Sequence, residues 1–192
     1  MLTTCSGVIG SPGRVTSASP RDSGRARIRF HRMAHALVPI LIAIGVALSL
    51  MGLNAATVKI GAWYDALRKP AWNPPKWAFG PAWTVILSLA AIACATVWAA
   101  APSAQARAGL FALVAVNLIL NGLWSQLFFN LRRPDWALAE IGVLLVSILS
   151  LIVTFAPVSP VAAALILPYL LWVMFASVLN FAIWRLNRLQ PA

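Results

Sequence analysis

The chain is short of charge, and above all of acidic residues. Only 10% of its 192 residues are charged, and 4 Asp and Glu stand against 15 Lys and Arg. In an ordinary soluble domain about 25% of residues are charged, so a soluble globular fold is excluded. A nucleic-acid-binding protein would carry its basic residues on a solvated face beside a normal number of acids. Because this chain has no such face, nucleic acid is excluded as a partner.

Cysteine and histidine are also scarce. Cys5 lies in a basic stretch and Cys94 in an apolar one, while His31 and His35 have no third metal-binding side chain near them. A disulfide framework, a metal site and thiol redox chemistry are therefore not expected. The sequence also offers neither a nucleophile–base pair nor paired carboxylates, so no catalytic residues are predicted for hydrolytic chemistry.

Apolar sequence is abundant, since 61% of the residues are hydrophobic and they gather in five long runs. Each run is long enough to cross a hydrocarbon core of about 30 Å as a helix. Short proline-containing breaks separate the later runs, which makes consecutive helices antiparallel neighbours. The prediction is an all-α integral membrane protein, folded as a five-transmembrane-helix bundle among membrane lipid. The predicted spans are 36–56, 79–101, 108–131, 136–156 and 160–184.

Residues 1–32 form a basic tail, rich in Arg, Ser, Gly and Pro, that cannot bury enough apolar surface to fold alone. Two interpretations remain open: an organellar transit peptide, or a mis-assigned start with Met33 as the true first residue. The membrane domain is expected over 33–192. Without the tail, nearly all cations lie on the side of loop 57–78 and the C-terminus, which places that side in the cytoplasm. We expect a bacterial cell membrane rather than an organellar one.

Polar and aromatic side chains share one face in two of the spans, at 100° per residue. Amides in hydrocarbon need partners. They are explained either by interhelical hydrogen bonds or by a cavity whose aromatic walls suit a planar hydrophobic ligand. The face of the third span holds Asn117, Asn121, Trp124 and Phe128, and that of the fifth holds Tyr169, Trp172, Ala176 and Asn180.

Glu140 is the only acid well inside a span. It is either a group on a proton or substrate pathway or, as we favour, a side chain that reaches the interface or pairs with Arg132 or Arg133. The face of the third span opposite its amides carries small residues, which suits either a homo-oligomer contact or packing within the chain. That face consists of Ala108, Ala112, Ala115, Gly122 and Gln126.

The first loop, 57–78, interleaves aromatic residues with prolines. Prolines restrict the backbone and lower the entropy lost in holding one shape. A mere connector between helices does not need this composition. We therefore expect the loop to form a lid over the ends of the helices.

Several motifs in order resemble the tryptophan-rich sensory protein / translocator protein family, also called the peripheral-type benzodiazepine receptor family. The resemblance spans roughly residues 36 to 188. In the loop it rests on Trp63-Tyr64, Lys69-Pro70, Pro74-Pro75, Phe79-Gly80-Pro81 and Trp83-Thr84. Further along it rests on Asn121-Gly122-Leu123-Trp124-Ser125, Phe128-Phe129, Arg133-Pro134, Pro168-Tyr169-Leu170 and Leu179-Asn180.

This resemblance implies a bundle, usually homodimeric, that binds porphyrins and other tetrapyrroles, sterols and benzodiazepine-type ligands beneath the first loop. It implies no obligatory cofactor, but a porphyrin- or haem-type ligand. The positions that it implies for the pocket are Trp63, Trp72, Trp83, Asn121, Trp124, Phe128, Tyr169, Trp172, Ala176 and Asn180. Leu87 stands where the family commonly has tyrosine, and Gln126 where it commonly has proline. Phe181 replaces the tyrosine of a proposed sterol motif, so porphyrin-type ligands rank above sterols.

Three functions follow from the resemblance and the composition. The first is a receptor, sensor or carrier without enzymatic activity that binds tetrapyrroles. The second is light-dependent porphyrin degradation, in which Trp63 and Trp172 would donate electrons or hydrogen. The third is a regulatory partner of other membrane proteins that turns over no ligand.

Overall fold

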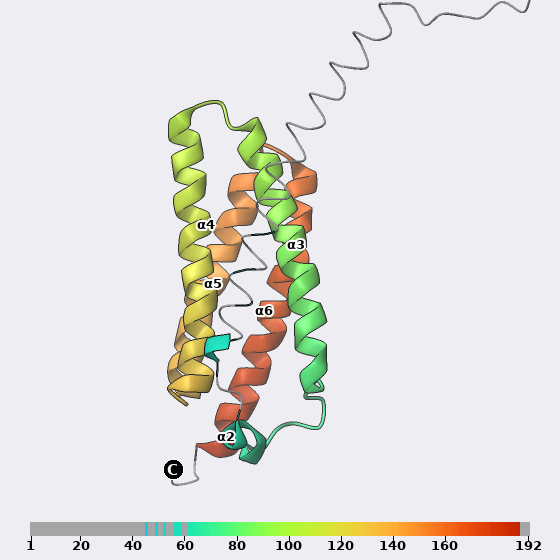
Figure 1. Ribbon diagram of the computed structural model, residues 1–192, viewed down its shortest axis with the longest axis vertical. Helices are drawn as coiled ribbons and strands as arrows, with labels where there is room; N and C mark the ends of the chain where they lie inside the picture. Colours follow the sequence, from blue (N-terminus) through green and yellow to red (C-terminus); the bar gives the residue numbers. More distant parts are fainter. Residues whose placement is uncertain (1–44, 46–48, 50–51, 53–55, 59–60, 189–192) are drawn as a thin grey trace, which may run out of the picture. The chain divides into compact units, whose positions relative to one another are not determined.

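The computed structural model describes residues 45, 49, 52, 56–58 and 61–188. The predicted tail 1–32 and most of the first predicted span, 36–56, lie outside the described residues. The described chain is all-helical (Figure 1). Its helices are α2 (Ala62–Ala66), α3 (Lys76–Ala100), α4 (Ala104–Ser125), the π-helical turn η1 (Gln126–Asn130), α5 (Pro134–Phe155) and α6 (Pro160–Asn187).

Four helical stretches are long and apolar enough to cross a membrane. They are Lys76–Ala100, Ala104–Asn130, Pro134–Phe155 and Pro160–Asn187, so the protein is a multi-pass integral membrane protein. Their ends differ by a few residues from the predicted spans because hydropathy ignores capping. The helix α3 starts at Lys76 because Pro75 before it is extended, with ψ 146°.

Residues in the proline-containing breaks between the spans help to start the helix that follows each break. The hydroxyl of Ser103 accepts from the Ala106 N–H at 3.1 Å, and that of Ser159 accepts from the Ala162 N–H at 3.2 Å. These contacts satisfy backbone donors that have no partner within the helix. Pro134 and Pro160 occupy the first position of α5 and α6, where a missing N–H costs nothing.

The helix α5 packs against α4 and α6, and α6 also packs against α3 (Figure 1). Large side chains such as Phe155 and Ile166 are fully buried in this core, beside small ones such as Ala93 and Ala162. Small residues let helix backbones approach closely, which favours van der Waals packing between helices in lipid. The core thus holds α3–α6 in fixed positions around the bundle interior.

A hydrogen-bond network crosses three of these helices. The Tyr169 hydroxyl in α6 accepts from Asn121 Nδ2 at 3.0 Å and donates to Asn117 Oδ1 at 3.2 Å. Asn117 Nδ2 donates to the Ser147 hydroxyl of α5 at 2.8 Å. Asn117 and Asn121 therefore both make interhelical bonds, as one of the two sequence-based explanations predicted.

The last turn of α4 departs from the prediction, which had a plain α-helix up to residue 131. From Gln126 to Asn130 the chain is π-helical, and two side-chain amides of this turn hydrogen-bond Thr57, which follows the first predicted span. Gln126 Nε2 donates to the Thr57 hydroxyl at 3.1 Å, and Asn130 Nδ2 donates to the Thr57 carbonyl at 2.9 Å. Gln126, one residue of the small-residue face, therefore makes its contact within the chain.

Candidate functional site

Aromatic side chains from α3, α4 and α6 face one small cavity inside the bundle. Ile141 and Leu144 of α5 complete its wall, and the Asn121 amide is its polar group. Its volume is about 20 Å³, room for little more than a water molecule. The lining residues are Phe79, Trp83, Asn121, Trp124, Ile141, Leu144, Trp172, Val173 and Ala176. Five predicted pocket positions, Trp83, Asn121, Trp124, Trp172 and Ala176, are among them.

Three further predicted positions form a second layer around this cavity. Phe128 stacks on Trp124 with ring centroids 5.3 Å apart, and Trp63 meets Phe128 edge-on at 6.0 Å. Tyr169 packs edge-on against Trp83 at 6.0 Å. These rings hold the lining tryptophans in place rather than line the space themselves.

Two predicted positions lie away from the cavity. Asn180 is buried against the start of α5, and with its amide oxygen and nitrogen exchanged it donates to the Pro134 carbonyl and accepts from the Leu138 N–H, both at 3.2 Å. Trp72 is 48% exposed and touches Phe175 edge-on at 5.8 Å. Asn180 shares a face of α6 with lining residues, but its contact with α5 lies nearer the end of the bundle than the cavity does. The helix-face pattern alone could not distinguish these positions.

Residues 61–75, here called the lid segment, dock on the aromatic layer through Tyr64 of α2. The Tyr64 ring is buried and meets Phe129 edge-on at 5.5 Å, while Lys69 Nζ lies 4.5 Å from its centroid on the ring face. Burial raises the pKa of the Tyr64 hydroxyl. An exposed ion pair between Asp65 and Lys76 also links α2 to α3. The hydrogen bond from Lys76 lowers the pKa of Asp65.

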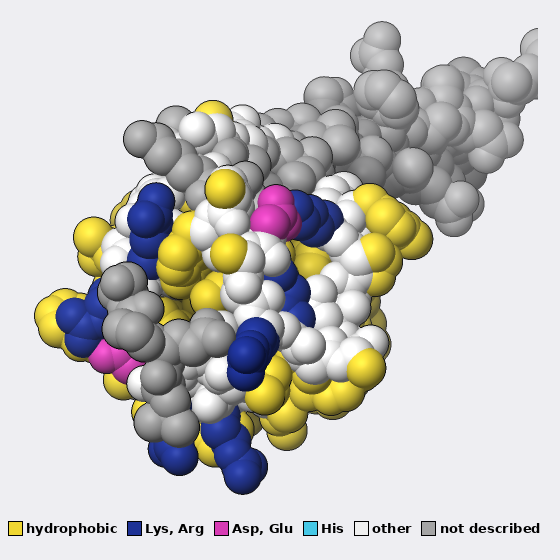
Figure 2. All heavy atoms as spheres, turned by 90° about the horizontal axis from the view of Figure 1, so that it is seen from below, with side chains coloured by type: hydrophobic (Ala, Val, Ile, Leu, Met, Phe, Trp, Pro, Cys, Tyr) yellow, Lys and Arg dark blue, Asp and Glu magenta, His cyan; other side chains and the backbone are white. Residues whose placement is uncertain are grey.

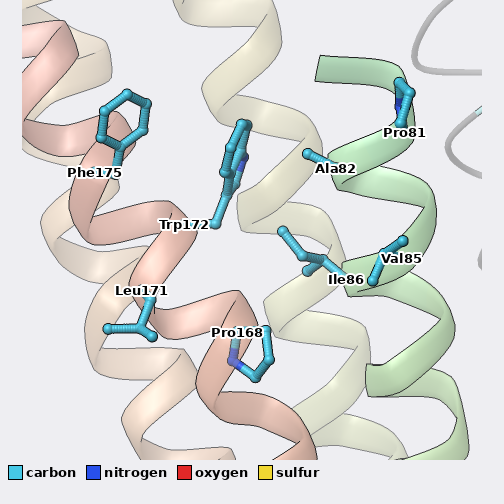
Figure 3. Close-up of a pocket in the computed structure, with 8 residues that line it drawn as sticks. All are labelled: Pro81, Ala82, Val85, Ile86, Pro168, Leu171, Trp172 and Phe175. Carbon is cyan, nitrogen blue, oxygen red and sulfur yellow. The ribbon is translucent and has the colours of Figure 1, made fainter. Parts of the chain in front are cut away.

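A larger open groove runs along the outer side of the cavity between α3 and α6 (Figure 3). Its volume is about 570 Å³, and its lining is almost wholly apolar. Trp172 of α6 stands between α6 and α3 in this groove (Figure 3) and also lines the inner cavity. The Trp172 indole is therefore the partition between the two spaces. Hydropathy patterns gave no sign of this groove, because its residues read as ordinary lipid-facing ones.

Glu140 pairs with neither Arg132 nor Arg133, and Arg133 pairs with Asp135 instead. Arg133 binds Asp135 with Nη2 to Oδ2 at 2.6 Å, and its guanidinium lies over the Trp136 ring at 4.7 Å. Glu140 is buried, and neither carboxyl oxygen has a hydrogen-bond partner in the described part of the chain. The favoured interpretation, that Glu140 reaches the interface or pairs with Arg132 or Arg133, is therefore wrong.

Lys and Arg side chains gather at the end of the bundle that carries α2 (Figure 2). Arg107, in the first turn of α4, lies at the other end. Among the described residues, the α2 end is therefore the more basic end of the bundle. The described cations at the α2 end are Arg68, Lys69, Lys76, Arg132, Arg133, Arg185 and Arg188.

Comparison with known proteins identifies the family. The model of the TspO/MBR family matches residues 36–185. The chain is 36% identical to protein CrtK of Rhodobacter capsulatus over 142 residues, 74% of this chain and 89% of that protein. It is 37% identical to tryptophan-rich protein TspO of Chlorobaculum tepidum over 154 residues, 79% of this chain and 97% of that protein. It is 35% identical to human translocator protein over 126 residues, 65% of this chain and 75% of that protein. The chain belongs to the TspO/MBR family of five-helix membrane proteins.

Proposed function

We propose that this protein is a membrane receptor, sensor or carrier for planar tetrapyrroles of the porphyrin type. The observation that carries the proposal is the convergence of Trp83, Trp124 and Trp172, from three different helices, on one cavity beside the Asn121 amide. Flat aromatic walls suit a planar apolar ligand, and a single amide orients its polar edge. The lid segment above the aromatic layer excludes water from the bound ligand.

Binding requires the cavity to open. Ligand sites for molecules of this kind have volumes of about 300–1,000 Å³, far above the inner cavity's 20 Å³ and comparable with the groove's 570 Å³. Rotation of the Trp172 indole would join the two spaces. We propose that the ligand occupies this joined space, with one face against Trp172 and its edge toward Asn121.

Sterols rank below porphyrins in this proposal. The candidate sterol motif runs through Leu179, Phe181 and Arg185, and Phe181 has no hydroxyl for its central position. The Phe181 ring packs beside Trp184, with centroids 5.9 Å apart, on the outside of α6. We also propose a homodimer in a bacterial cell membrane, in keeping with the bacterial origin of CrtK and TspO relatives.

Quenching of tryptophan fluorescence by protoporphyrin tests the proposal on the detergent-solubilised protein. Saturable quenching is expected, with an affinity that Trp172→Ala and Asn121→Ala each weaken about tenfold. Trp77→Ala is the matched control, since Trp77 is 74% exposed and outside the cavity. Absence of saturable quenching, or equal affinity in all variants, would overturn the proposal and favour a regulatory partner that binds no such ligand.

Light-dependent degradation of the pigment is the competing function. Trp63 is linked to the cavity through Phe128 and Trp124, and Trp172 lines it, so both indoles are near a bound pigment. Illumination of the complex separates the two functions. Binding alone predicts pigment loss at the rate seen in protein-free detergent, unchanged by Trp63→Phe and Trp172→Phe. A faster loss that both variants abolish would establish the photochemical function instead.

A further inference from the structure

A carboxyl group and an indole N–H are buried without partners beside the proposed ligand cavity. Glu140 of α5 is 8% exposed, and neither of its oxygens has a hydrogen-bond partner among the described residues. The Nε1 atom of Trp124 in α4 is likewise buried and unpartnered there. A buried polar group without a hydrogen-bond partner destabilises the folded protein. Two of them on helices that pack together indicate a site for a further group.

The register of α4 and α5 brings these two groups to the same level. The Asn117–Ser147 hydrogen bond joins the two antiparallel helices. Two turns, about seven residues, along each helix from this bond lead to Trp124 and Glu140 on the same faces. Trp124 and Ile141, the neighbour of Glu140, both line the inner cavity. Trp124 and Glu140 therefore lie at the height of the inner cavity along the bundle.

Neighbouring polar groups on these helices are already satisfied within the protein. Asn117, Ser147 and Tyr169 bond to one another, and Arg133 pairs with Asp135. Glu140 and Trp124 are thus outside the network that joins the helices. Their lack of partners is not a general property of the bundle interior.

We propose that Glu140 and Trp124 form a polar subsite that binds a hydroxyl group on an otherwise apolar ligand. A hydroxyl oxygen both donates and accepts, so it can donate to the Glu140 carboxyl and accept from the Trp124 N–H. The subsite rests on the proposed function, since it supplies a second polar point in the same cavity. A ligand carboxylate would face the Glu140 carboxyl unfavourably, so acidic substituents of a tetrapyrrole point away from this level.

Two fluorescent probes that differ in one hydroxyl test the subsite, 1-pyrenemethanol and 1-methylpyrene. The wild-type protein should bind the alcohol about tenfold more tightly, which is the effect of about one to two satisfied hydrogen bonds. Glu140→Leu and Trp124→Phe should bring that ratio near one, while Glu140→Gln, which keeps an acceptor oxygen, should retain part of it. Ser150→Ala is the control, because the Ser150 hydroxyl bonds only its own helix, to the Val146 carbonyl at 2.9 Å.

Unfolding of the ligand-free protein gives a second readout. Glu140→Leu should raise the midpoint of thermal unfolding, because it replaces an unpaired buried carboxyl with an apolar group. A lowered midpoint would reveal an internal partner for Glu140 and overturn the subsite. Equal affinity of the wild type for both pyrenes would also overturn it, while leaving protoporphyrin binding intact. Absence of saturable binding by both pyrenes and by protoporphyrin would instead overturn the proposed function itself.

Discussion

Asn187, in the last turn of α6, hydrogen-bonds both backbone groups of Arg68 in the lid segment. Its Oδ1 accepts from the Arg68 N–H at 3.0 Å, and its Nδ2 donates to the Arg68 carbonyl at 2.9 Å. The same Nδ2 donates to the Ile183 carbonyl at 2.7 Å, which orients the amide from its own helix. One side chain therefore fixes the chain just after α2 to the last turn of α6.

Asn187→Ala should release the lid segment while leaving the cavity residues in place. We expect protoporphyrin to dissociate several-fold faster, because the loss of one or two hydrogen bonds lowers the barrier to lid opening by about 1–2 kcal/mol. Stopped-flow displacement measures this rate. Asn187→Asp keeps the acceptor and loses the donor, so its rate should be intermediate. An unchanged dissociation rate in Asn187→Ala would show that the lid does not limit ligand release.

The prolines of the lid segment should act through entropy. Pro75 caps α3 in an extended conformation, and the Pro70 carbonyl accepts from the Asn73 N–H at 3.0 Å in a turn before it. Pro74→Gly and Pro75→Gly should each weaken protoporphyrin binding by about 0.4–1 kcal/mol, because the free lid becomes more disordered. Titration and dissociation kinetics together check this. An unchanged dissociation constant with an unchanged off-rate would contradict it.

Acid should loosen the attachment of α2 to α3. Hydrogen bonding to Lys76 lowers the pKa of Asp65 below its ordinary value of 3.8. A lowered carboxyl pKa means that the ion pair stabilises the folded lid above pH 3.8, and that this contribution is lost as the pH falls further. Hydrogen exchange of the α2 amides should therefore increase over this acid range more in the wild type than in Asp65→Asn. Parallel pH profiles for the two proteins would rule out this contribution.

The sequence predicted the helices better than it predicted the local geometry of the site. Runs of apolar residues determined the spans, because every backbone group in lipid must be satisfied by a helix. Helix faces brought Asn121 and Trp172 together, since 100° per residue is accurate over a few turns. Asn180 shares that face of α6, and the structure places it against the start of α5. The sequence also gave no sign that Arg133 pairs with Asp135 rather than with Glu140. The π-turn at Gln126 and the partition by Trp172 depend on tertiary contacts that no periodic pattern encodes.

The hydroxyl of Tyr169 should contribute to stability through the network between helices. Tyr169→Phe keeps the ring against Trp83 but leaves Asn117 and Asn121 without their shared partner. Interhelical hydrogen bonds in membrane proteins contribute about 0.6 kcal/mol on average and up to about 1.7 kcal/mol, and a loss in this range is expected on denaturation in detergent. Ser177→Ala, which removes a bond only to Val173 within α6, should change stability less. A Tyr169→Phe protein as stable as the wild type would mean that the amides find other partners.

Arg132 is the one non-glycine residue with a positive φ among the described residues. It connects η1 to α5 with a φ of 54°, in the left-handed region that suits glycine. Arg132→Gly should stabilise the purified protein by about 0.5–1 kcal/mol, because relief of the left-handed conformation exceeds the extra entropy of an unfolded glycine. Arg133→Gly is the matched control: φ is −114° there, and the change breaks the ion pair with Asp135, so stability should fall. If Arg132→Gly also lowers stability, the Arg132 side chain contributes more than its backbone strain costs.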